Sequence, residues 1–151
     1  WQCRRTAATS ARLIAEGHDP FVVSRTGLGI NPLFPAGKLA WVLENVTDAR
    51  DLLAKGCLRA GTVDAWLLWN LTGGAVFATD HSNASRAQLF DTQRLEFSAD
   101  LARIFGADIS CLPRPLPSDS LFGSTARGAT ALPADVPIHA MMLSLMRMAA
   151  L

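Results

Sequence analysis

The sequence has no long apolar run and little net charge, and each shortage excludes a class of protein. No stretch is long and apolar enough to span a bilayer. The net charge is +1, from 14 basic and 13 acidic residues, which gives no electrostatic reason to expect nucleic acid or an acidic membrane surface as a partner. Hydrophobic residues make up 50% of the chain, so its composition is typical of a globular protein and not of a disordered one.

Residues for disulfide and metal chemistry are also scarce. Cys3, Cys57 and Cys111 are odd in number and far apart, so they predict reduced thiols in a cytoplasmic protein, with no disulfide framework and no metal-ligand pair. The three histidines lack the spacing of a second ligand, and no metal site is expected. The sequence has no initiator methionine, and it ends within a helical pattern, so we expect a piece of a longer protein.

Apolar spacing and capping residues predict a helix-rich chain in which short strands return at intervals. Helices are expected over residues 4–16, 36–46, 48–55, 63–71, 84–90, 99–105 and 144–151. Strands are expected over residues 1–3, 75–78, 121–123 and 136–140, the last one buried. Residues 18–35 and most of 107–135 are rich in Pro, Gly and Ser and are predicted to be irregular. This order is typical of an α/β layered domain, and 151 residues is a one-domain length.

Helical spacing also predicts which side chains are buried. The expected inward faces are Ala7, Ala11 and Ile14 in the first helix; Leu39, Val42, Leu43 and Val46 in the second; and Val63, Trp66, Leu67 and Leu71 in helix 63–71. The tryptophans Trp41, Trp66 and Trp69 are interpreted as core packing. Thr47, Thr62 and Ser98 are expected to cap the helices that follow them.

Short motifs follow one another along the chain in a characteristic order. They are Trp1–Ala7, Thr26–Leu28 with Asn31–Phe34, Lys38–Asn45, Gly61–Trp69, Thr79–Arg86, and then Leu112-Pro113, Ser118–Ser120 and Phe122-Gly123. In this order and spacing they resemble the FGGY family of carbohydrate kinases, and within it the members that phosphorylate glycerol. The resemblance covers nearly the whole chain.

The resemblance implies an α/β fold of the ribonuclease-H-like type, as in actin and hexokinase ATPases, present here as a partial, helix-rich lobe. Residues 1–151 would form part of the N-terminal kinase lobe, and the nucleotide-binding C-terminal lobe would be absent. For the parent enzyme it implies ATP and Mg²⁺ as cofactors and a small polyol or sugar as substrate, with no nucleic-acid or membrane partner. The parent would be a cytoplasmic homo-oligomer, and these 151 residues alone would bind no cofactor.

Phosphoryl transfer to an alcohol needs a base that takes the hydroxyl proton. In the family this base is an Asp after a buried strand, and counting back from Ala149 places Met146 at its position and Arg147 at the next polar ligand. A thioether cannot accept that proton, so no catalytic residue is assigned. The resemblance further implies that Trp1 packs on the carbon backbone of the substrate, and that Leu33 occupies the position of a substrate-contacting Tyr.

Several alternatives stay open. Because Leu33 offers no hydroxyl, another polyol or a ketose, such as erythritol or xylulose, could replace glycerol. Met146 could reflect a sequence error, a degenerate non-catalytic protein, or a shifted alignment with a substitute base. Lys38 either has an active role or forms a structural salt bridge. A set of polar motif residues either lines the cleft or serves helix capping and loop hydrogen bonding: Asp64, Asp80, Asn83, Ser85 and Arg86.

Overall fold

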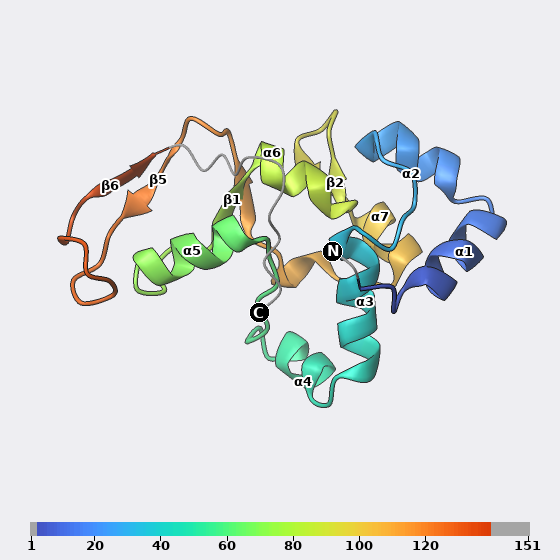
Figure 1. The fold of residues 1–151 in the computed structure, drawn as a ribbon, viewed down its shortest axis with the longest axis horizontal. Helices are drawn as coiled ribbons and strands as arrows, with labels where there is room; N and C mark the ends of the chain where they lie inside the picture. The colour runs from blue at the N-terminus through green and yellow to red at the C-terminus, as the bar shows by residue number, and fades with distance from the viewer. Residues whose placement is uncertain (1–2, 140–151) are drawn as a thin grey trace. The chain divides into compact units, whose positions relative to one another are not determined.

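The computed structural model describes residues 3–139, and the chain divides into two compact units (Figure 1). Unit 1 combines Trp1–Ala60 with Ser85–Leu112, and unit 2 combines Gly61–Ala84 with Pro113–Leu151. The chain passes from unit 1 to unit 2 and then through each unit once more. The expectation of one domain from the chain length stays a prediction. Most of the strand expected at 1–3 and all of the helix expected at 144–151 lie outside the described residues.

Unit 1 is a helical unit with one short hairpin. Its elements are α1 (Ala7–Ala15), α2 (Asp19–Thr26), α3 (Pro35–Asn45), α4 (Ala49–Ala54), the 3₁₀ turn η1 (Ser85–Ala87), β2 (Phe90–Asp91), β3 (Glu96–Phe97), α7 (Ala99–Phe105) and the 3₁₀ turn η2 (Ile109–Cys111). β2 and β3 pair antiparallel, with Phe90 opposite Phe97. Buried side chains from several helices form its core: Leu13, Val22, Ile30, Ala36, Leu39, Leu43, Ala49, Ala87, Leu89, Leu101, Ala102, Phe105 and Cys111.

In unit 1 the helices predicted over residues 4–16, 36–46, 48–55 and 99–105 are confirmed as α1, α3, α4 and α7, with small shifts at their ends. α3 buries Leu39 and Leu43 as expected, but Val46 is exposed because the chain turns extended there and ends the helix. α7 is capped by Ser98, whose Oγ accepts a hydrogen bond from Leu101 N at 3.4 Å. α4 follows Asp48 and not Thr47, and Asp48 takes a left-handed conformation with φ of 65°.

Two predictions in the first thirty residues are wrong. α1 buries Ser10 and Leu13, whereas Ile14 is 48% exposed, so the helix is rotated relative to the expected apolar face. Residues 18–35, predicted to be irregular, contain α2. Its proline, Pro20, lies in the first turn, where a missing N–H costs nothing.

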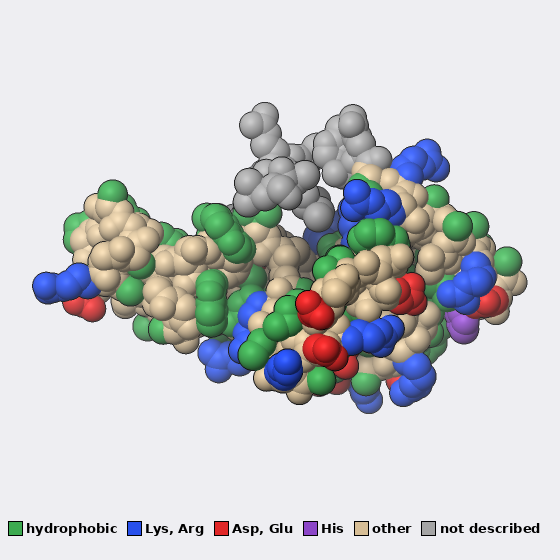
Figure 2. Space-filling model, turned by 90° about the horizontal axis from the view of Figure 1, so that it is seen from below, with side chains coloured by type: hydrophobic (Ala, Val, Ile, Leu, Met, Phe, Trp, Pro, Cys, Tyr) green, Lys and Arg blue, Asp and Glu red, His purple; other side chains and the backbone are tan. Residues whose placement is uncertain are grey.

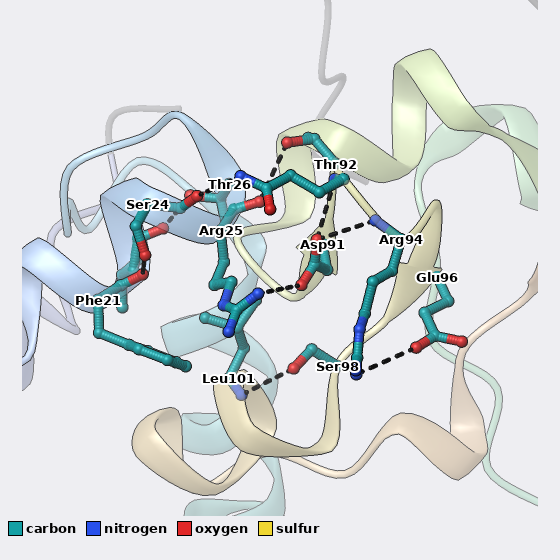
Figure 3. A network of polar contacts seen from close by, with 12 residues as sticks. Phe21, Ser24, Arg25, Thr26, Asp91, Thr92, Arg94, Glu96, Ser98 and Leu101 are labelled. Carbon is teal, nitrogen blue, oxygen red and sulfur yellow. Dashed lines mark hydrogen bonds and ion pairs between the residues drawn. The ribbon is translucent and has the colours of Figure 1, made fainter.

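Side-chain and backbone contacts tie α2 to the β2–β3 hairpin within unit 1 (Figure 3). Arg25 Nη1 lies 3.5 Å from Asp91 Oδ2, and its guanidinium stacks 5.4 Å from the centre of the Phe21 ring. Thr92 donates to the Arg25 carbonyl from its backbone N at 2.9 Å and from Oγ1 at 3.1 Å. The hairpin therefore fixes the C-terminal end of α2.

Unit 2 is built around a parallel strand pair. Its described elements are α5 (Val63–Leu71), β1 (Ala78–Asp80), α6 (His81–Ala84), β4 (Arg114–Leu116), β5 (Leu121–Ser124) and β6 (Pro137–His139). β1 and β4 run parallel, with Asp80 opposite Leu116, and β5 and β6 pair antiparallel. α5 lies beside β1 in Figure 1.

Several strand predictions in this unit need correction. The strand expected at 75–78 begins only at Ala78, because Gly73 and Gly74 both take positive φ and extend the turn. The helix expected over 84–90 is instead the end of α6, the turn η1 and β2. β4 was not predicted, and β6 was expected to be buried although Pro137 and His139 are exposed.

The predicted inward face of α5 is wrong. Asp64, Ala65 and Leu68 are buried, whereas Trp66 and Leu67 are 52% and 41% exposed. α5 carries apolar residues on all of its sides, so their spacing could not predict which side is buried. The polar residue Asp64, on the inner side, determines the orientation of the helix. Trp69 is also exposed, although its ring meets Phe77 edge to face at a centroid distance of 5.9 Å.

Within residues 3–139, no helix is long and apolar enough to cross a membrane. The face drawn in Figure 2 carries Lys and Arg side chains next to Asp and Glu side chains, and hydrophobic side chains reach the surface between them. The mixed signs agree with the small net charge of the chain.

Candidate functional site

The predicted substrate contact Leu33 lies in a fixed turn at the start of α3, in unit 1. Asn31 Oδ1 accepts a hydrogen bond from Leu33 N, and Lys38 Nζ donates to the Leu33 carbonyl, both at 2.9 Å. The Leu33 side chain is 40% exposed. Its backbone is therefore held on both sides while its apolar side chain stays accessible to a small molecule.

A structural salt bridge was one interpretation of Lys38, and Lys38 forms none among residues 3–139. Within the described residues no carboxylate lies within ion-pair distance of Lys38; its ammonium group hydrogen-bonds the carbonyl of Leu33. This hydrogen bond holds the turn that contains Leu33 against the first turn of α3.

Two arginines stack on aromatic rings of α3 and of the residue just before it. Arg86 lies 5.2 Å from the ring centre of Phe34, the residue before α3, and Arg5 lies 4.9 Å from the ring centre of Trp41. Both guanidinium groups thus have an aromatic partner and hold flanking segments against α3. Trp41, expected in the core, is half-buried under Arg5.

The first motif packs on α3 through a threonine and a glycine. Thr6 is buried, and a Cβ on Gly37 would lie 3.4 Å from Thr6 Cβ, so the Thr6 side chain packs directly over Gly37. Thr6 Oγ1 has no hydrogen-bond partner in the described structure. Next to it, Cys3 is exposed, and the backbone N–H of Arg5 lowers the pKa of its thiol, with further lowering from the charges of Arg5 and Lys38.

Unit 2 holds a buried cluster of carboxylates at the carboxyl end of the β1–β4 pair. Asp80 is fully buried; its Oδ1 accepts from Asn83 N at 2.8 Å and from Asn83 Nδ2 at 2.7 Å, and its Oδ2 accepts from Ser118 Oγ. Thr79 Oγ1 donates to Asp64 Oδ2, and both residues are buried. These bonds join α5, β1, α6 and the segment after β4.

This cluster is better suited to holding its segments together through hydrogen bonds than to taking a proton from a substrate. Asp80 is fully buried and accepts three internal hydrogen bonds, so a substrate hydroxyl could not reach this carboxylate without rearrangement. Asp64 Oδ1 has no partner in the described structure, but Asp64 is only 2% exposed. The geometry favours the loop-bonding interpretation of Asp64, Asp80 and Asn83 over a place in the cleft.

Gln88 is a buried polar residue that none of the sequence arguments singled out. It has a φ of 60°, and its Nε2 donates to the Gly29 carbonyl at 2.6 Å, while Oε1 has no partner in the described structure. This contact fixes the glycine turn after α2. A left-handed backbone conformation is expected at glycine, so nothing in the sequence predicts it at a glutamine.

The remaining predicted site residues are not placed. Trp1, Met146 and Arg147 lie outside the described residues, so their roles stay predictions. Across residues 3–139, no group of three or more His, Cys, Asp or Glu side chains could hold a metal ion.

A helix-rich α/β fold whose polar residues gather at the carboxyl end of a parallel strand pair is typical of α/β ligand-binding proteins. The profile of the FGGY family of carbohydrate kinases, N-terminal domain, matches residues 1–144. The chain belongs to this family, and the fold is that of the sugar kinases in the actin/hexokinase class.

Two curated relatives are glycerol kinases. The chain is 46% identical to the glycerol kinase of Symbiobacterium thermophilum over 138 residues, which are 91% of this chain and 27% of that protein. It is 49% identical to the glycerol kinase of Methylobacterium nodulans over 125 residues, 83% of this chain and 25% of that protein. The chain therefore spans about a quarter of the length of the relatives it matches.

Solved structures are similar over the same span. Plasmodium falciparum glycerol kinase with ADP has a TM-score of 0.83 and 27% identity, covering 90% of this chain and 27% of that one. A xyloylose kinase from Brucella ovis has a TM-score of 0.71 and 25% identity, covering 89% of this chain and 27% of that one.

Proposed function

We propose that the parent protein is an ATP-dependent kinase that phosphorylates glycerol, and that this chain supplies part of its N-terminal domain. The observation that carries the proposal is the 46% identity to a glycerol kinase over 138 residues, because identity at this level usually preserves the substrate class. The fixed Leu33 turn and the packed first motif are the parts of the described structure that would present the substrate contacts.

In this proposal ATP and Mg²⁺ are held by parts of the parent outside this chain. The described residues contain no group of three or more His, Cys, Asp or Glu side chains that could hold a metal ion. Asp64 Oδ1, a buried carboxylate oxygen without a partner in the described structure, is enclosed. A cytoplasmic location and a homo-oligomeric parent are further predictions of the same kind.

Leu33 supports the alternative substrate. Its accessible side chain offers an apolar contact where the family resemblance implies a hydroxyl, so a substrate that needs no hydrogen bond there would bind as well. Another polyol or a ketose, such as erythritol or xylulose, fits this description.

A chimeric enzyme tests which of the candidate substrates the parent phosphorylates. Residues 1–139 of this chain replace the matched segment of the Symbiobacterium thermophilum glycerol kinase, and ADP release is measured with glycerol, erythritol and xylulose. We expect glycerol to give the highest kcat/KM. We also expect Leu33→Tyr to lower the KM for glycerol about fivefold, the effect of one regained hydrogen bond. A higher kcat/KM with xylulose or erythritol would establish the alternative.

The remaining alternative is a non-catalytic parent, and it depends on Met146. Resequencing the coding DNA across residues 139–151 shows whether an Asp codon stands at position 146. If Met146 is confirmed, a chimera that extends to residue 151 should be inactive. Activity of that chimera with Met146 in place would mean that another residue serves as the base.

A further inference from the structure

The described part of unit 2 buries little apolar surface for the elements it orders. Its hydrophobic cluster holds three buried residues, Leu68, Ala78 and Phe122, among residues 61–84 and 113–139. The same described segments expose six large hydrophobic side chains: Trp66, Leu67, Trp69, Leu121, Leu132 and Val136. A unit of this size with so small a described core gains stability when further apolar surface covers it.

α5 carries the densest part of this exposed surface. Trp66, Leu67 and Trp69, here called the α5 outer face, lie within four consecutive residues of one helix. Helices that are apolar on all sides are normally covered on all sides. Trp69 has Phe77 as a partial cover, but Trp66 and Leu67 are 52% and 41% exposed.

The outward direction of these side chains is fixed from the inner side of the helix. Asp64 accepts the Thr79 hydroxyl hydrogen bond in a buried position, and Ala65 and Leu68 pack beside it. Rotating α5 to bury Trp66 would expose this bond and leave the β1 hydroxyl without its acceptor. The exposure of the α5 outer face is therefore a property of the fold.

We propose that the α5 outer face is the docking surface for the part of the parent polypeptide that lies outside these 151 residues. The chain belongs to a family whose matched members are about four times longer, since it covers 27% of the Symbiobacterium thermophilum relative. Three quarters of the parent is thus available to complete the core of unit 2. The proposal rests on the family and on packing, and not on the kinase activity proposed above.

The chimera with residues 1–139 in the Symbiobacterium thermophilum kinase provides the test, with melting temperature as the readout. We expect Trp66→Glu to lower the melting temperature of the chimera by about 5 °C or more, because it places a charge in a buried contact. In the isolated chain the same change should shift melting by about 1 °C or less, since Trp66 is half exposed there. Ile14→Glu, at a helix residue that is 48% exposed in unit 1, is the matched control and should act equally in both contexts.

A second measurement does not depend on a folded variant. Hydroxyl-radical footprinting by mass spectrometry should show Trp66 and Leu67 several-fold less reactive in the unmodified chimera than in the isolated chain. Equal reactivity in both would overturn the proposal. So would a dimer of the isolated chain in sedimentation velocity that Trp66→Glu dissociates, because a second copy would then be the occupant. A chimera that shows the Trp66 effect but no kinase activity would support docking while counting against the proposed function.

Discussion

Asp64 and Thr79 are buried together because one side chain accepts the hydrogen bond that the other donates. The Thr79 hydroxyl donates to Asp64 Oδ2, while Asp64 Oδ1 has no partner in the described structure. A buried carboxylate with a single donor depends strongly on it, since desolvation of the unpaired group is not compensated. Asp80, with three donors from Asn83 and Ser118, is far less dependent on any one of them.

Thr79→Val keeps the shape of the side chain and removes this donor. We expect it to lower the free energy of unfolding by about 1–3 kcal/mol, measured by urea denaturation followed by circular dichroism. Thr92→Val is the control; its hydroxyl bonds the Arg25 carbonyl in an exposed position, and the change should stay within about 0.5 kcal/mol. Equal costs at the two positions would show that the Asp64 bond does not stabilise the chain.

The three cysteines should differ in reactivity because their surroundings differ. The pKa of Cys3 is lowered mainly by the backbone N–H of Arg5, whereas burial, followed by the charge of Asp108, raises the pKa of Cys111. The thiolate is the reactive form, so at neutral pH we expect iodoacetamide to modify Cys3 fastest and Cys111 only after unfolding. Peptide mass spectrometry over time gives the order; modification of Cys111 in the folded chain would contradict it.

At the scale of elements, the sequence predicted helices better than it predicted their faces. α3 and α7 each combine a regular stripe with a clear end signal, and both were found where expected. α1 and α5 carry apolar residues on more than one side, so their orientation depends on tertiary contacts such as Asp64 with Thr79. Local periodicity contains no information about such partners.

Short strands and the site residues were the least predictable features. β4 has only three residues, and its pairing with β1 joins positions 114–116 to 78–80, so no local pattern marks it. The motifs pointed to Leu33, Lys38 and Asp80, but not to what each contacts. The Lys38 bond to the Leu33 carbonyl and the Gln88 bond to Gly29 arise only when distant segments meet.

The helix caps allow one difference between the sequence prediction and the structure to be tested. Ser98 and Thr47 were both expected to cap, but only Ser98 accepts a cap hydrogen bond in the structure, from Leu101 N. We expect Ser98→Ala to cost about 0.5–1 kcal/mol of unfolding free energy, and Thr47→Ala less than about 0.3 kcal/mol. Both residues belong to unit 1, so one urea titration of each variant compares them directly. A larger loss at Thr47 would mean that the sequence, and not the structure, identified the cap correctly.

At the scale of the whole chain, the two units differ in how much apolar surface each one buries. The unit 1 cluster includes thirteen buried residues, and the unit 2 cluster includes three within the described part of the chain. The described part of unit 2 therefore gains less free energy from apolar burial than unit 1 does.

Native-state hydrogen exchange of the isolated chain should reveal this difference. We expect the amides of α3 and α7 in unit 1 to exchange slowest, because they open only with the largest cluster of buried side chains. Amides of α5, β5 and β6 in unit 2 should exchange through an opening that costs less free energy. Peptide-level mass spectrometry resolves the two groups. Equal protection of both would mean that unit 2 is stable without further covering, and the exposed Trp66 and Leu67 would then need no partner from the rest of the parent polypeptide.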